Sequence, residues 1–112
     1  MKLTDFGLSA LCPRGQLLCD DCGSEYYIPP EMIVKRPYGR KVDLWSAGVT
    51  MFILLTNKMP FSGSTLKETL KQILEVNIPD KSDCMWKLIS PECQDLLRKL
   101  LMKDPEQRLD AE

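Results

Sequence analysis

The sequence predicts a mainly α-helical fold with at most a short β stub at the N-terminus, and three observations lead to this prediction. The run VDLWSAGVTMFILLT at residues 42–56 is almost continuously apolar. The segment that begins near Ser64 carries apolar residues at helical spacing, and so does the segment that follows Ser90. With 112 residues, the chain is long enough for one small domain.

The composition is that of an ordinary globular protein and argues against two classes of partner. Hydrophobic residues make up 44% and charged residues 28% of the chain. The formal net charge is −1, which gives no electrostatic basis for binding nucleic acid or an anionic membrane. Met1 leads directly into the sequence KLTD, without the apolar segment of a signal peptide. We therefore expect no nucleic acid and no membrane among the partners.

The cysteines do not have the spacing of a disulfide framework. There are five of them, an odd number, at irregular intervals. Cys19 and Cys22 form a C-x-x-C pair, but a zinc site would need two more good ligands and the chain contains no histidine. We expect reduced thiols in an intracellular protein, either cytoplasmic or nuclear.

The N-terminal part is predicted to be a long loop that ends in a short helix. Residues 2–4 have the composition of a β stub, and Asp5-Phe6-Gly7 follows them. Prolines, a glycine and adjacent aspartates interrupt any period between residues 8 and 24, which predicts a loop. A loop of this length in a compact domain is usually functional or disordered. Two prolines then fix a rigid turn, and a short helix can begin at Pro30 or Glu31.

Residues 42–56 are predicted to form the central helix. Only Ser46, Gly48 and Thr50 interrupt the apolar run. A helix that is apolar on every side is expected to be buried on every side. It is too short to cross a bilayer, which needs about 20 apolar residues. Asp43 stands at the helix start, where a carboxylate can cap free amides and suits the positive end of the helix dipole.

A second helix is predicted after a turn at residues 62–64. Ser64 or Thr65 can cap it, and it is expected to run to about Val76. One apolar stripe follows its length, formed by Leu66, Leu70, Ile73 and Leu74.

The last helix is predicted to follow a polar linker at residues 77–82 and a short apolar docking stretch. The docking stretch consists of Trp86, Leu88 and Ile89. Ser90 is the expected cap, and the proline after it suits the first helical position. The helix is expected to end near Lys103. Its buried face is predicted to contain Leu96, Leu97, Leu100 and Leu101.

Three motifs, in this order and at this spacing, resemble the protein kinase family. D-F-G at residues 5–7 is followed by a loop, then by G-S-x-x-Y-I-P-P-E at 23–31 and D-L-W-S-A-G-V at 43–49. M-P-F at 59–61 and D-P-x-x-R at 104–108 match later elements of the family. Within the family, the chain is most similar to serine/threonine kinases of the calcium/calmodulin-dependent type.

The resemblance covers residues 1–112 and implies a partial kinase domain from the large, C-terminal lobe. Residues 1–31 resemble the activation segment, residues 42–56 the central buried helix, and residues 64–112 the C-terminal helical part. The family transfers a phosphoryl group from Mg-ATP to serine or threonine of proteins. The resemblance therefore implies ATP and Mg²⁺ as cofactors, and a protein substrate or regulatory protein as partner.

The D-F-G motif carries the cofactor role in this resemblance. Asp5 matches the aspartate that holds Mg²⁺ on the ATP phosphates, and its carboxylate suits a hard cation that keeps most of its waters. Phe6 matches the residue whose packing separates active from inactive states. Gly7 matches the position about which the loop pivots.

Further positions match structural or regulatory residues. Ser24 matches the hydroxyl that bonds the catalytic aspartate and helps to seat the substrate. Glu31 matches the acidic partner of an arginine near the C-terminus, here Arg108, in a structural brace. Asp43 matches a residue that bonds the backbone of the catalytic loop. Asp20 stands where many members carry a phosphorylated threonine, and it is either a fixed mimic of that charge or a solvated loop residue.

The sequence departs from the family pattern in two places and lacks several of its parts. Glu25 stands where the family often has proline, and Pro29 replaces the usual alanine. The glycine-rich loop, the strand lysine and the catalytic loop with its base have no counterpart in the chain.

We therefore expect a fragment, cut on both sides, of an ATP-dependent serine/threonine kinase. As an isolated chain it is expected to be inactive and to bind neither ATP nor Mg²⁺ tightly. Two alternatives stay open, a non-catalytic interaction module derived from a kinase and an incomplete gene product.

Overall fold

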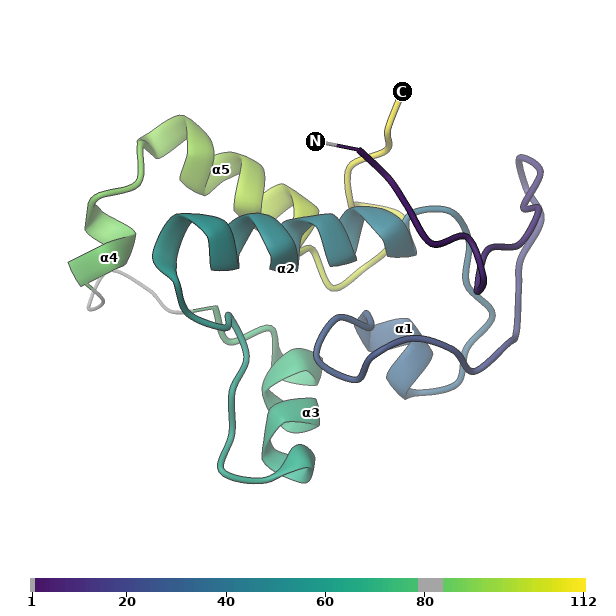
Figure 1. Cartoon of the computed structure of the whole chain (residues 1–112), viewed down its shortest axis with the longest axis horizontal. Helices are drawn as coiled ribbons and strands as arrows, with labels where there is room; N and C mark the ends of the chain where they lie inside the picture. Colours follow the sequence, from purple (N-terminus) through teal and green to yellow (C-terminus); the bar gives the residue numbers. More distant parts are fainter. Residues whose placement is uncertain (1, 79–83) are drawn as a thin grey trace.

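A computed structural model describes residues 2–78 and 84–112, and this part of the chain contains five helices. The helices are α1 (Pro30–Ile33), α2 (Val42–Thr56), α3 (Leu66–Glu75), α4 (Cys84–Lys87) and α5 (Pro91–Leu100). Helix α2 runs along the long axis of the molecule, with α5 along one side and α1 and α3 on the other (Figure 1). The prediction of a mainly helical fold is confirmed.

Strand structure is almost absent from the described residues. The single β-like feature there is a bridge in which Leu18 and Tyr38 exchange two backbone hydrogen bonds, of 2.8 and 2.9 Å. Residues 2–4 form no strand, so the short β stub that the sequence allowed is not found. A short strand is stable only when a neighbouring strand supplies hydrogen bonds. The bridge joins Leu18 and Tyr38, so it supplies none to residues 2–4.

Helix α2 organises two apolar clusters. Its first half contributes Trp45 to a cluster in which the indole stacks on Phe61, with ring centroids 5.7 Å apart. Its second half contributes Phe52, which stacks on Trp86 at 5.9 Å. The first cluster also contains Val49, Ile73 and Leu101, and the second contains Ile89 and Leu97.

The glycine within α2 is explained by the approach of α5. A Cβ atom at Gly48 would lie 2.9 Å from the Cβ of Leu100 and 3.1 Å from a methyl group of Leu101. Such distances are too short for ordinary contact, so only glycine allows the two helices to pack this closely.

The expectation that α2 is buried on every side is wrong. One stripe of the helix is exposed, and it contains Asp43, Ala47, Thr50 and Leu54. The side chain of Leu54 is 69% exposed. These residues are spaced four, three and four apart and therefore share one face. Helices α1, α3 and α5 cover the other faces only.

Asp43 does not cap α2 as the sequence predicted. The cap position is Lys41, which has helical backbone angles, and no side chain accepts a hydrogen bond from the first turn. Asp43 lies within that first turn and is exposed. Its carboxylate still suits the positive end of the helix dipole.

The start of α3 follows the sequence prediction. Thr65 accepts a hydrogen bond from the amide of Glu68 (3.2 Å), and the Glu68 carboxylate accepts one from the amide of Ser64 (2.8 Å). The arrangement resembles a capping box, except that the carboxylate bonds the amide of the residue before the cap, Ser64, instead of the amide of Thr65 itself. In the predicted stripe, Ile73 is buried, while Leu66 is 43% exposed.

Helix α5 begins as predicted but ends earlier. The Ser90 hydroxyl accepts from the amide of Cys93 at 3.3 Å. The helix ends at Leu100 rather than near Lys103. The chain turns there so that the carbonyl groups of Met102 and Lys103 can accept hydrogen bonds from Arg108.

The apolar positions around α4 and α5 are not all buried. Trp86, Ile89 and Leu97 are buried, whereas Leu88 is 78% exposed and Leu96 is 39% exposed. Most of the predicted polar linker, residues 77–82, lies outside the described residues. No helix in the described part is both long and apolar enough to cross a bilayer.

Candidate functional site

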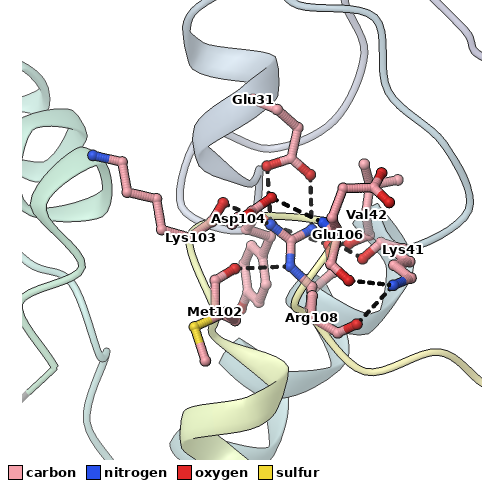
Figure 2. Close-up of polar contacts among 10 residues, drawn as sticks. Glu31, Lys41, Val42, Met102, Lys103, Asp104, Glu106 and Arg108 are labelled. Carbon is pink, nitrogen blue, oxygen red and sulfur yellow. Dashed lines mark hydrogen bonds and ion pairs between the residues drawn. The ribbon is translucent and has the colours of Figure 1, made fainter.

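The site is organised around an ion pair that joins Glu31, in α1, to Arg108, in the turn that follows α5. The Arg108 guanidinium donates to both carboxylate oxygens of Glu31, with Nη1 to Oε1 at 2.7 Å and Nη2 to Oε2 at 2.9 Å (Figure 2). Arg108 is 2% exposed and Glu31 is 6% exposed. Two parallel charge-assisted bonds fix the relative orientation of the two segments as well as their distance.

The remaining donors of Arg108 are also satisfied. Nε donates to the carbonyl of Met102 at 3.0 Å, and Nη1 donates to the carbonyl of Lys41 at 3.1 Å. The guanidinium carbon lies 5.2 Å from the centre of the Trp45 ring. A buried charge with this many partners is stabilised where an unpaired one would be costly.

A second contact ties the start of α2 to the same turn. The Lys41 ammonium group donates to the carbonyls of Glu106 (3.2 Å) and Arg108 (2.8 Å) (Figure 2). The turn from Met102 to Arg108 is thus held from the side of α1 and from the side of α2.

Glu31 reaches Arg108 because α1 begins at a fixed place. Pro30 occupies the first helical position, and Pro29 before it has extended backbone angles. Both prolines are buried. Their restricted geometry sets the direction in which the short helix leaves the loop.

The D-F-G motif lies in an exposed segment. Asp5 has a φ of +62°, a left-handed conformation that aspartate tolerates better than most residues. Its carboxylate accepts a long hydrogen bond from the amide of Gly7, at 3.4 Å. Phe6 is 68% exposed, and its carbonyl accepts from the amide and hydroxyl of Ser9.

Asp5 fits Mg²⁺ in its chemistry but supplies a single ligand. Mg²⁺ prefers oxygen ligands and is commonly held by one or two carboxylates together with substrate phosphates. Within residues 2–78 and 84–112, no group of three or more His, Cys, Asp or Glu side chains gathers where a metal could bind. Asp5 therefore suits a metal that arrives with its own phosphate and water ligands.

The loop before Ser24 is pinned by Tyr38. The Tyr38 hydroxyl donates to the carbonyl of Asp20 at 2.9 Å. Burial raises the pKa of Tyr38 to about 12, and the neighbouring Cys22 thiol adds to this effect. The hydroxyl consequently stays protonated, and stays a donor, across the physiological range.

Two neighbouring aspartates in this loop, Asp20 and Asp21, differ in their contacts. The Asp20 side chain makes no ion pair with any described residue, and the residue is exposed. Its neighbour Asp21 pairs with Lys35 at 3.1 Å. Sequence reasoning did not predict this pair, because its members are 14 positions apart and no periodic pattern relates them.

Ser24 and Asp43 are exposed. The carbonyl of Ser24 accepts from the amide of Tyr27 at 2.9 Å. Ser46 on α2 has a role that its place in an apolar run does not predict. Its hydroxyl donates to the carbonyl of Tyr27 at 3.0 Å, so it ties the segment that precedes α1 to α2.

The chain is similar to known protein kinases along its whole length. The sequence model of the protein kinase domain matches residues 1–112. Over 111 residues the chain is 43% identical to calcium-dependent protein kinase 29 and 44% identical to calcium-dependent protein kinase 4, both from Arabidopsis thaliana. It is 42% identical to calcium-dependent protein kinase 19 of Oryza sativa subsp. japonica.

The chain is much shorter than these relatives. Each match covers 99% of this chain but only 20%, 22% and 20%, respectively, of the relative. The chain thus spans about a fifth of the length of the curated relatives that it matches.

Proposed function

Because the chain belongs to the protein kinase family, we propose that it forms the activation segment and lower helices of the large lobe of a serine/threonine kinase. The single observation that carries this proposal is the buried pair between Glu31 and Arg108. It joins the P-P-E end of the activation segment to the D-P-x-x-R turn across 77 positions of sequence. Those are the two motifs that the family relates to each other.

Each part of the chain has a role in phosphoryl transfer under this proposal. Asp5 would hold Mg²⁺, and the metal would supply neutralisation of the charge on the transferred phosphoryl group. Phe6 and Gly7 set the position of Asp5, and Ser24 seats the substrate hydroxyl. Glu31 and Arg108 fix the end of the activation segment against the helices. The expected partners are protein substrates or regulatory proteins, inside the cell.

The isolated 112-residue chain is expected to transfer no phosphoryl group. The sequence contains no catalytic base, no strand lysine and no glycine-rich loop, and transfer depends on these groups for alignment and charge stabilisation. Phosphoryl transfer is measured by incubating the chain with labelled ATP, Mg²⁺ and a serine peptide and following the label on the peptide. Turnover above that of a mock preparation from the same host would overturn the expectation.

The kinase role itself is tested by a chimera. Residues 1–112 replace the matched segment of calcium-dependent protein kinase 4, the relative at 44% identity. We expect the chimera, assayed with calcium and Mg-ATP, to phosphorylate a serine peptide that the unmodified relative phosphorylates. A folded chimera without activity would contradict the proposal.

One observation favours a second candidate, a non-catalytic interaction module. The adjacent residues Leu54 and Leu55 at the end of α2 are 69% and 41% exposed, and apolar surface that forms a contiguous patch marks a contact with another chain. The chimera assay separates the two candidate functions. The kinase role requires phosphorylation of the serine peptide, whereas an interaction module does not. An incomplete gene product would have neither property.

A further inference from the structure

The turn that carries Ser24 is closed by its own backbone. The amide of Tyr27 donates to the carbonyl of Ser24 at 2.9 Å, and residues 25–27 form the turn. Tyr26, in the middle of the turn, is 43% exposed, whereas the side chain of Tyr27 packs against the apolar cluster that contains Trp45. The orientation of the turn therefore depends on how Tyr27 is held.

The residues that follow the turn cannot donate to the Tyr27 carbonyl in the usual way. In an ordinary β-turn a carbonyl accepts from the amide three residues later, and here that residue is Pro30, which has no N–H. Pro29 lacks one as well. Tyr27 is half-buried, and a carbonyl left unpaired away from water costs free energy. The donor comes from another segment instead.

Ser46 of α2 is that donor. Its hydroxyl donates to the Tyr27 carbonyl at 3.0 Å and lies 3.3 Å from the carbonyl of Val42, one turn earlier in the helix. A hydroxyl carries a single proton, and the contact to Tyr27 is the shorter of the two. Helix α2 contributes to both apolar clusters, so this bond holds the end of the turn to a rigid element.

The segment on the other side of Ser24 is held by a second side-chain donor. The Tyr38 hydroxyl donates to the carbonyl of Asp20, four residues before Ser24, while Ser46 holds the carbonyl three residues after it. Between the two anchored carbonyls, Gly23 has a φ of +114°, a conformation that other residues rarely adopt. With both ends anchored and a tight bend between them, few backbone conformations remain for Ser24.

We propose that Ser46 is a positioning residue for the reaction and that, by fixing the carbonyl of Tyr27, it places the Ser24 hydroxyl for its contact with the substrate. The inference rests on the proposed kinase function, which assigns substrate seating to Ser24. Ser46 acts through the backbone of the turn and does not itself contact the substrate. Without its hydroxyl the turn adopts other conformations, and the apparent affinity for the substrate falls with the fraction of molecules in the competent one.

The test compares Ser46→Ala with Thr50→Ala in the chimera that carries residues 1–112. Thr50 is the matched control, because its hydroxyl donates to the carbonyl of Ser46 at 2.9 Å, an exposed contact within the same helix. Hydrogen exchange of the Tyr27 amide, which closes the turn, is followed by mass spectrometry on fragments that differ by this residue. Turnover is measured with labelled ATP as kcat and as separate KM values for a serine peptide and for Mg-ATP.

Ser46→Ala is expected to speed exchange of the Tyr27 amide about fivefold and to raise the KM for the peptide by a similar factor, the effect of one hydrogen bond. The KM for Mg-ATP is expected to stay at the parent's value, and Thr50→Ala to resemble the parent in every measurement. In a Ser24→Ala background, Ser46→Ala is expected to have no further effect on the KM for the peptide, because the two residues act through one contact.

The outcomes separate this inference from the function on which it rests. A chimera that turns over with the same KM for the peptide in Ser46→Ala and Thr50→Ala overturns the inference and leaves the kinase function standing. Additive effects of Ser24→Ala and Ser46→Ala also overturn it, since Ser46 would then act on the fold and not through Ser24. Faster exchange in Ser46→Ala, in a chimera whose parent has no turnover, supports the anchoring of the turn and contradicts the kinase function.

Discussion

Replacing Arg108 by alanine is expected to lower the free energy of unfolding by about 3–5 kcal/mol, the usual result when one partner of a buried ion pair is removed. The variant leaves the Glu31 carboxylate buried without its two guanidinium bonds. It also leaves the carbonyls of Lys41 and Met102 without a donor that they have in the parent. The measurement is urea unfolding of the chimera, followed by circular dichroism.

Two further variants show whether loss of the buried ion pair causes the drop in the free energy of unfolding. Arg36→Ala removes an exposed arginine near α1 and is expected to change stability little. Replacing both partners, with Glu31→Gln and Arg108→Met together, is expected to cost less than Arg108→Ala alone, because no buried charge is then left unpaired. Equal effects of Arg108→Ala and Arg36→Ala would show that the pair does not brace the fold.

The isolated chain is expected to be expanded, to bind apolar dyes and to unfold without a sharp transition. Leu54 and Leu55 on α2 are 69% and 41% exposed, and Phe6 and Leu8 are exposed at 68% and 73%. Burying a side chain of this kind contributes about 1.5–3 kcal/mol. For these four residues the missing burial rivals the whole stability of a small domain, about 5–15 kcal/mol.

The measurement is urea unfolding of the isolated chain by circular dichroism, together with dye binding and amide resonance dispersion. Leu54→Gln is the informative variant, since it removes apolar surface from the exposed stripe and should lower dye binding without loss of helical signal. Thr50→Gln, on the same stripe, is the matched control. A monomer with a cooperative transition, dispersed resonances and no dye binding would contradict the prediction and favour the interaction module.

The elements that the sequence predicted well have signals within a few residues of one another. Thr65, a capping residue, stands directly before the apolar stripe of α3, and Ser90 stands directly before a proline at the start of α5. The apolar run at residues 42–56 has the same bounds as α2. In these segments local propensity and tertiary packing favour the same conformation.

The sequence alone could not place features that depend on distant segments. Apolarity on every side of α2 predicted burial, but it could not tell which face lacks a neighbour within this chain. The early end of α5 depends on hydrogen bonds to Arg108, and the need for glycine at position 48 depends on the approach of Leu100. Glu31 and Arg108 are 77 positions apart, so the resemblance to kinases predicted their pairing and no local pattern did.

The most direct test of the central claim compares Asp5→Asn with Asp95→Asn in the chimera. Asp95 is an exposed aspartate on α5 that pairs with Lys99, one helical turn away. We expect Asp5→Asn to lower kcat/KM by about a hundredfold or more, since metal-assisted charge stabilisation contributes several kcal/mol. The midpoint of urea unfolding should stay unchanged, and Asp95→Asn should retain the parent's activity. If Asp5→Asn retains full activity and the same Mg²⁺ dependence as the parent, Asp5 is not the metal-holding residue and the segment does not serve the kinase reaction as we propose.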